Sequence, residues 1–113
     1  MWYVLQTETK AIDGTLQAKV RVPAESAWFD GHFPGYPVLP GIAQLGMVLD
    51  LIRSAMLPSA SVTEVSRVRF KQMILPEERL KVMVEARPVR QGTFDFRITR
   101  QDKVVCSGTM TIN

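Results

Sequence analysis

The sequence contains one cysteine and no long apolar run, and each shortage excludes a class of protein. Cys106 cannot form an intramolecular disulfide, and a zinc site built on cysteines would lack partners. We therefore expect no metal, and a reducing cytosol is the simplest compartment. The longest apolar-rich stretch, residues 41–56, holds Gln44, Asp50 and Arg53, so it is too short and too polar to span a bilayer.

Clustered charge and a leader segment are missing as well. The formal net charge is +3, and no run of five like charges occurs, so nothing indicates nucleic-acid binding. Residues 1–6 lack a basic start and a long apolar segment, so we expect no secretory signal. A length of 113 residues, 46% of them apolar and 22% charged, predicts a single ordered domain spanning residues 1–113.

Hydrophobic periodicity predicts two strands, one helix and then four strands. Apolar and polar residues alternate over residues 16–22, which is typical of a strand with one face on a core. Asp13-Gly14, Gln91-Gly92 and Gln101-Asp102 mark turns. The expected strands are residues 2–8, 16–22, 62–70, 80–89, 93–100 and 104–112, and the expected helix is residues 41–56.

The helix has apolar residues over much of its surface. Ile42, Leu45, Leu49 and Ile52 recur at helical spacing, and Met47, Val48 and Leu51 widen the stripe. Such a helix is expected to be central. One long helix against a mostly antiparallel sheet is an α+β arrangement, and its order matches the hotdog fold, a curved antiparallel sheet wrapped around one central helix.

Residues 29–40 form the most unusual segment. They hold two glycines and three prolines, which exclude regular structure and predict a stiff loop leading into the helix. His32, the only histidine, lies in this loop and can exchange a proton near neutral pH. Beside it, the first helical turn has unpaired N–H groups, and Gly41 leaves them accessible to a carbonyl oxygen. A base beside such a site suits α-proton abstraction from a thioester, although a lone loop histidine is often structural.

Residues 31–41 read Gly-His-Phe-Pro-Gly-Tyr-Pro-Val-Leu-Pro-Gly. They resemble the G-H-F-P-x-x-P-x-x-P-G signature of the 3-hydroxyacyl-carrier-protein dehydratases of fatty acid synthesis. Residues 65–76 resemble the same family's central strand and the turn after it. The resemblance implies a hotdog fold, a homodimer with its sheets joined edge to edge, and an acyl chain in a tunnel near the interface. It also implies cofactor-free loss of water from a 3-hydroxyacyl thioester on an acyl carrier protein.

Carried over by position, His32 would be the catalytic histidine, and the Gly41 backbone N–H would bind the thioester carbonyl. We expect Phe33, Ile42 and Gly46 to lie beside them in the substrate-binding site. Arg67, Arg69 and Lys71 alternate with apolar residues, which on a strand places three cations on one face. This row could dock an acidic carrier protein, or it could be an ordinary solvated strand face.

One departure from the family pattern concerns the acid. The family has a Glu or Asp where this chain has Gly46, so the acid that helps the 3-hydroxyl leave is missing. Asp50, one helical turn further on, is the nearest substitute, but it could instead face solvent or pair with Arg53. Gln44 could supply a hydrogen bond but no acidic proton. Gly46 itself fits either close packing or extra room for a ligand.

The favoured interpretation is a 3-hydroxyacyl-thioester dehydratase in which His32 takes the C2 proton and Asp50 or a water replaces the acid. One alternative is an acyl thioesterase. Another is a catalytically impaired acyl-binding protein or a partner subunit of an active homologue. We expect a homodimer or an assembly of dimers, because pairing would cover an exposed sheet edge.

Overall fold

The computed structural model describes residues 2–30 and 38–113, and it contains six strands, one α-helix and one 3₁₀ helix within them. In chain order these are β1 (Val4–Lys10), β2 (Leu16–Arg21), η1 (Ala27–Phe29), α1 (Gly41–Ala55), β3 (Val62–Phe70), β4 (Arg79–Ala86), β5 (Thr93–Arg100) and β6 (Lys103–Ile112). All the predicted strands and the predicted helix are present in the predicted order. The short η1, capped by the Ser26 hydroxyl, is the one element that periodicity did not indicate.

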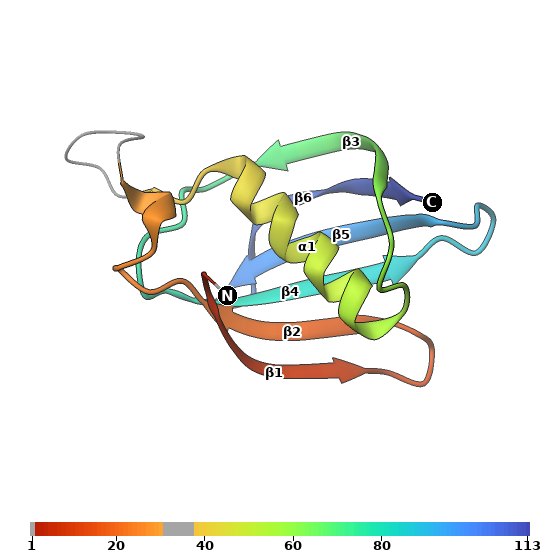
Figure 1. Cartoon of the computed structure of the whole chain (residues 1–113), viewed down its shortest axis with the longest axis horizontal. Helices are drawn as coiled ribbons and strands as arrows, with labels where there is room; N and C mark the ends of the chain where they lie inside the picture. Colours follow the sequence, from red (N-terminus) through yellow and green to blue (C-terminus); the bar gives the residue numbers. More distant parts are fainter. Residues whose placement is uncertain (1, 31–37) are drawn as a thin grey trace.

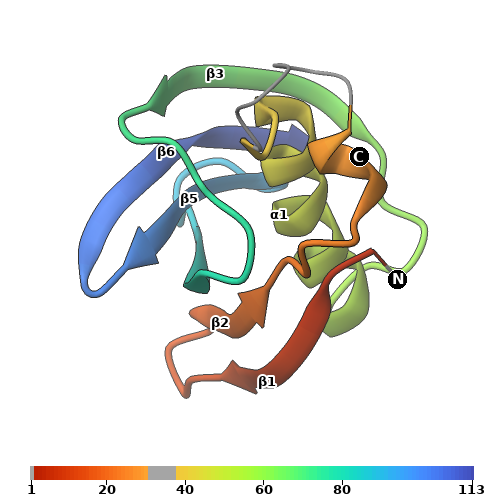
Figure 2. The same cartoon turned by 90° about the vertical axis from the view of Figure 1, so that its left-hand side faces the viewer.

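The six strands form one sheet in the order β1-β2-β4-β5-β6-β3, and every neighbouring pair is antiparallel. Figure 1 shows α1 lying across this sheet, with β1 and β3 at its two edges. In the turned view of Figure 2 the sheet curves around the helix. This arrangement confirms the predicted α+β hotdog fold.

Alternation along the strands explains which face meets the helix. In β2, Leu16, Ala18 and Val20 are buried while the residues between them are not, and β4 buries every second residue in the same way. Burying these alternate side chains under α1 supplies the hydrophobic stabilisation of the layer. At the β5–β6 turn, Gln101 and Asp102 both have positive φ (50° and 64°), as the two central residues of a type I′ hairpin require.

The buried face of α1 includes part of the predicted apolar stripe and leaves the rest partly exposed. The helix buries Ala43, Gln44, Met47, Val48, Leu51 and Ile52. Ile42 is 71% exposed, and Leu45 and Leu49 are only partly buried. A helix that is apolar over most of its surface carries two stripes at helical spacing, and periodicity cannot decide which one meets the sheet. The second stripe, with Ile42 and Leu49, therefore keeps part of its surface exposed.

Candidate active site

The start of α1 has no side-chain cap. Pro40 stands at the N-cap with extended backbone, no side chain caps the helix, and no acidic residue lies in its first turn. Ala43 and Gln44 donate their N–H groups to the Pro40 oxygen at 3.1 and 3.2 Å. Within residues 2–30 and 38–113, the N–H groups of Gly41 and Ile42 find no acceptor. Two free donors at the positive end of a helix can polarise a carbonyl oxygen.

A pocket of about 320 Å³ lies directly at this helix start. Its lining consists of Val38, Leu39, Pro40, Gly41, Gln44, Phe70, Lys71, Gln72 and Met73. A Cβ added to Gly41 would stand 2.5 Å from Cζ of Phe70, so glycine is what lets the aromatic ring lie over the helix start. Phe70 and Met73 are 51% and 59% exposed, and they give the pocket an apolar wall. An apolar wall beside paired N–H donors suits an acyl thioester.

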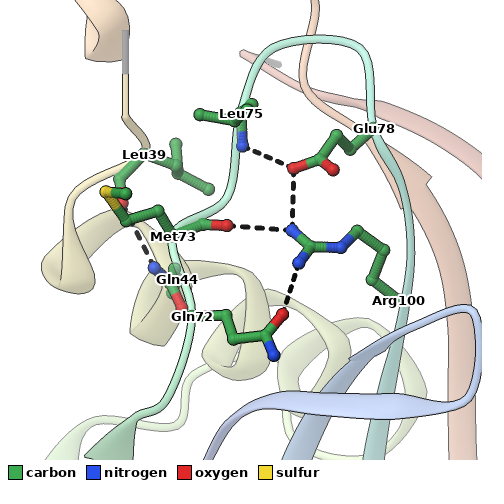
Figure 3. A network of polar contacts seen from close by, with 7 residues as sticks. All are labelled: Leu39, Gln44, Gln72, Met73, Leu75, Glu78 and Arg100. Atoms are coloured by element: carbon green, nitrogen blue, oxygen red, sulfur yellow. Dashed lines mark hydrogen bonds and ion pairs between the residues drawn. The ribbon is translucent and has the colours of Figure 1, made fainter. Parts of the chain in front are cut away.

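Gln44 supplies a buried polar group to the same pocket. Its side chain is buried, and its Nε2 donates to the Leu39 oxygen at 3.2 Å (Figure 3). Its Oε1 accepts no hydrogen bond from the described part of the chain. A buried acceptor without a partner is unfavourable, so this oxygen can accept a hydrogen bond from a bound ligand. From the sequence, Gln44 was expected only to supply a hydrogen bond in place of the missing acid, and its position in the pocket was not predicted.

The far wall of the pocket is held by Arg100, at the end of β5 (Figure 3). One of its terminal nitrogens donates to both the Met73 oxygen and Oε1 of Glu78, at 2.9 Å each. The other donates to the side-chain oxygen of Gln72. Glu78 also accepts a hydrogen bond from the Leu75 N–H at 2.6 Å, so its carboxylate links Arg100 to the backbone of the turn after β3.

A backbone hydrogen bond joins this wall to the helix start. The Leu39 N–H donates to the Ile74 oxygen at 2.8 Å, and both side chains are buried. The segment that follows β3 is therefore tied both to β5 and to the chain entering α1. Hydrogen bonds within the protein therefore hold both of these walls in place.

His32 and Phe33, the central residues of the predicted site, lie outside the described residues, and their roles stay predictions. The described residues on either side lie in the core and at the pocket. Phe29, just before the loop, is buried in the core, and Val38, just after it, lines the pocket at the helix start. Val38 is therefore the first described residue after His32, and it belongs to the pocket lining.

Gly46 does not serve close packing. An added Cβ would meet no described atom within 4 Å, which leaves room beside the helix. Asp50, one turn later, is half-buried and accepts a hydrogen bond from the Tyr3 hydroxyl at 2.9 Å. It does not pair with Arg53, whose Nε donates to the Ala60 oxygen at 2.9 Å. The bond to Tyr3 was not anticipated from sequence, because the two residues are 47 positions apart.

The predicted row of cations is interrupted by a β-bulge. The pairing of β3 with β6 shifts between Ser66 and Arg69, and Arg67 has a positive φ of 56°. Arg67 and Lys71 line a groove of about 330 Å³ in the sheet, whereas Arg69 is not in its lining. Because a bulge breaks the alternation of side chains, simple spacing does not describe this strand.

Two further cations, Arg87 and Arg97, line the same groove. Arg87 binds Asp95 at 3.0 Å, and the hydrogen bond from Arg87 holds the pKa of that carboxyl below its ordinary value. Asp95 therefore neutralises part of the groove and leaves an excess of positive charge. Lys71 lines both this cationic groove and the pocket at the helix start, so the two are neighbours.

Neither a metal-binding cluster nor a membrane-spanning helix occurs in the described part of the chain. Outside residues 1 and 31–37, no group of three or more His, Cys, Asp or Glu side chains is placed to hold a metal ion. None of the helices described is long and apolar enough to cross a bilayer.

A single helix cradled by a curved six-stranded antiparallel sheet, with a pocket at the helix start, defines a protein of the hotdog class. The model of the ApeI-like family, described as ApeI dehydratase, matches residues 7–109. The chain belongs to this ApeI-like dehydratase family.

Curated relatives agree with this assignment. The 3-hydroxyacyl-[acyl-carrier-protein] dehydratase FabZ of Clostridium perfringens is 32% identical over 112 residues, covering 90% of this chain and 76% of that protein. The FabZ of Pelotomaculum thermopropionicum is 36% identical over 80 residues, covering 61% of this chain and 54% of that protein. The chain therefore spans about half to three quarters of these relatives.

Solved structures confirm the fold. A chain of the dehydratase heterocomplex ApeI:P from Xenorhabdus doucetiae superposes with a TM-score of 0.88 at 21% identity, covering 99% of this chain and 98% of that chain. An uncharacterised protein from Erwinia carotovora gives 0.80 at 26% identity, covering 100% and 97%. A mutant thioesterase from Pseudomonas aeruginosa gives 0.67 at 20% identity, covering 93% and 77%.

Proposed function

We propose that the protein removes water from a 3-hydroxyacyl thioester carried on an acyl carrier protein and forms a 2-enoyl thioester. The observation that carries this proposal is the uncapped start of α1, which opens into a 320 Å³ pocket in a chain of a dehydratase family. The curated relatives named above are dehydratases of the same reaction class. No step of the proposed reaction requires a cofactor.

In the proposed reaction the thioester carbonyl oxygen accepts hydrogen bonds from the N–H groups of Gly41 and Ile42. Negative charge that develops on this oxygen is stabilised there, which weakens the C2–H bond. His32 takes the C2 proton, the C2=C3 double bond forms, and the C3–O bond breaks. The leaving hydroxyl takes a proton from Asp50 or from a water and departs as water. Phe33 and the open side of Gly46 contribute to the walls around the acyl chain.

The carrier protein is proposed to dock on the cationic groove. Four cations, Arg67, Lys71, Arg87 and Arg97, line it against one carboxylate, Asp95. Arg69 lies on the same strand, beyond the bulge, and adds to the positive charge nearby. Because Lys71 also lines the pocket, an acyl group delivered from this groove has a short path to the helix start. Docking of this kind weakens as salt is added.

The proposed assembly is a homodimer, or an assembly of dimers, formed along the β3 edge. Within the described residues β3 pairs only with β6, so its other edge offers unpaired backbone groups. Val62 and Val65 on β3 are 38% and 36% exposed, and Ile42 on α1 is exposed as well. Joining two copies here would cover the open edge and the second apolar stripe of α1 together.

A partner subunit is the second candidate function. A chain of a dehydratase heterocomplex has the same fold, and the space beside Gly46 is open in a helix that lacks the family acid. In such a complex the homologous partner would supply the acid. The thioesterase alternative is supported by fold likeness alone, at 20% identity.

The test is turnover of defined thioesters. We would incubate the purified protein with crotonyl and longer 2-enoyl thioesters and with 3-hydroxyacyl thioesters, and follow the conjugated enoyl absorbance. We expect turnover by the wild type, and a loss of at least about a hundredfold in His32→Ala and Asp50→Asn. Asp102→Asn, with a fully exposed side chain, serves as the control and should retain full turnover.

The other outcomes assign the alternatives. Free thiol released without any change in the enoyl group would indicate a thioesterase. Absence of turnover by the isolated chain, with activity regained on adding a homologous subunit, would indicate a partner subunit. Absence of turnover under all conditions would reject the dehydratase.

A further inference from the structure

The pocket at the start of α1 offers two kinds of polar group. Among the described residues, the N–H groups of Gly41 and Ile42 are donors without an acceptor. The side-chain oxygen of Gln44 is an acceptor without a donor among the same residues. Gly41 and Gln44 both line this pocket of about 320 Å³. A ligand that satisfies all of these groups must carry an acceptor and a donor of its own.

The Gln44 amide is held in one orientation. Its Nε2 donates to the Leu39 oxygen at 3.2 Å, and a carbonyl oxygen only accepts, so the amide nitrogen must face Leu39. The Leu39 N–H is itself fixed by the Ile74 oxygen at 2.8 Å. The Oε1 of Gln44 therefore points away from Leu39, as Figure 3 shows. Because Gln44 is only 4% exposed, leaving this oxygen unpaired is costly.

No other side chain of the lining offers a free acceptor. Within the described chain, only Gln44 and Gln72 bring side-chain oxygens to this pocket, and the Gln72 oxygen accepts from Arg100. Phe70 and Met73, which line the same pocket, are more than half exposed. Exposed side chains change rotamer rapidly, so these two can turn aside to admit a ligand to Gln44.

The spacing of the two groups matches one class of thioester. Gln44 follows Gly41 by three positions, so both lie on one face of α1, about 4.5 Å apart along the helix axis. In a 3-hydroxyacyl thioester, one methylene carbon separates the carbonyl carbon from the carbon that bears the hydroxyl. Its acceptor and its donor can therefore meet Gly41 and Gln44 together. A saturated acyl thioester has the acceptor but no such donor.

We propose that Gln44 is a substrate-binding residue that makes the pocket select 3-hydroxyacyl thioesters over saturated ones. Its Oε1 accepts a hydrogen bond from the 3-hydroxyl while the carbonyl oxygen rests on the N–H groups of Gly41 and Ile42. The 2-enoyl product has lost the hydroxyl, so it binds less tightly than the substrate. The inference rests on the proposed dehydratase function and names the substrate group that Gln44 recognises.

The experiment measures affinity without turnover. The ligands are pantetheine derivatives in which an amide NH replaces the thioester sulfur, one with a 3-hydroxyacyl chain and one with a saturated chain of equal length. By calorimetry, we expect the wild type to bind the 3-hydroxyacyl ligand about tenfold more tightly, the effect of one hydrogen bond to a buried acceptor. In Gln44→Met, which keeps the length of the side chain but removes the acceptor, this ratio should fall to about one.

The ratio separates recognition from stability, because a pocket that is merely loosened weakens both ligands alike. Gln91→Met is the matched control, since Gln91 is an exposed glutamine in the β4–β5 turn and lies outside the lining of this pocket. It should leave both affinities unchanged. Turnover of the corresponding 3-hydroxyacyl thioester by the wild type is measured alongside.

Each outcome separates this inference from the function it rests on. A preference that is lost in Gln44→Met, together with turnover, supports both. The same preference without turnover rejects the dehydratase and keeps the assignment of Gln44. Turnover without a preference in the wild type, or with an equal preference in Gln44→Met, keeps the dehydratase and rejects the inference. Binding of neither ligand by the wild type rejects the inference as well.

Discussion

At the residue scale, the helix start depends on Gly41 having no side chain. Its hydrogen occupies the place where a methyl group would collide with the Phe70 ring, 2.5 Å from Cζ. Glycine is required at this position for steric and not for conformational reasons, since the residue lies inside the helix. A side chain at position 41 would therefore displace the Phe70 ring from its place in the pocket wall.

Gly41→Ala tests this steric argument. The added methyl must push the half-exposed Phe70 ring toward the pocket, so we expect kcat/KM to fall at least about tenfold. The free energy of unfolding should change by less than about 1 kcal/mol, because alanine favours helix and the ring has solvent on one side. Steady-state kinetics and urea denaturation measure the two effects.

The matched variant is Gly41→Ala combined with Phe70→Ala, which removes the colliding ring. It should regain part of the lost kcat/KM if the collision is the cause. Full activity in Gly41→Ala alone would contradict the placement of the thioester carbonyl at the helix start.

At the element scale, sequence patterns predicted the strands and the helix but not the way they meet. Alternation in β2 and β4 was sufficient to predict which side of each strand is buried, because each strand has one apolar face. The helix is apolar over much of its surface, so its spacing did not predict which side meets the sheet, and Ile42 is exposed. The bulge in β3 and the Tyr3–Asp50 bond depend on tertiary contacts that no local pattern records.

The candidate site, like the fold, could be predicted from the sequence only in part. The sequence was sufficient to predict the loop of residues 31–41 from its glycine and proline spacing, and to place Gly41 at the helix start, because both features are local. The roles of three arginines could not be predicted, since each reaches its site from a strand or turn that is distant in sequence: Arg87, Arg97 and Arg100. Only the sheet order β4-β5-β6-β3 brings these strands beside the segment that follows β3.

At the element scale, one prediction concerns the hydrogen bonds that hold the turn after β3. Arg100→Met keeps an apolar stem but removes the hydrogen bonds to Met73, Glu78 and Gln72, and it leaves the half-buried Glu78 carboxylate without its cation. We expect the free energy of unfolding to drop by about 1–3 kcal/mol, and KM to rise because the far wall of the pocket loosens. Urea denaturation and steady-state kinetics measure both.

Arg90→Met is the control for that substitution, because Arg90 is an exposed arginine in the β4–β5 turn. It should change the free energy of unfolding by less than about 0.5 kcal/mol. Equal effects of the two substitutions would show that the Arg100 network does not stabilise the pocket.

At the scale of the whole molecule, a single hotdog chain leaves a sheet edge and an apolar part of the helix surface uncovered among the described residues. The β3 edge is open within the described residues, and the second stripe of α1 is exposed beside it. We expect sedimentation equilibrium at micromolar concentration to give at least twice the 12.7 kDa of the chain. Val65→Asp, which puts a charge at the proposed interface, should shift the protein toward the monomer.

Val89→Asp serves as the matched control. Val89 is 94% exposed and lies between β4 and β5, away from the proposed interface, so its charge should leave the assembly unchanged. A wild type that sediments as a monomer would contradict the edge-to-edge assembly.

The central claim is that this site dehydrates a 3-hydroxyacyl thioester with Asp50 in place of the missing acid. The most direct measurement is the rate of enoyl formation by wild type, by Asp50→Asn, and by Asp50→Asn combined with Gly46→Glu. An added Cβ at Gly46 meets no described atom within 4 Å, so a longer side chain can start there without a collision. We predict turnover by the wild type, its loss in Asp50→Asn, and its partial return with Gly46→Glu. An inactive wild type, or full turnover by Asp50→Asn, would contradict the account.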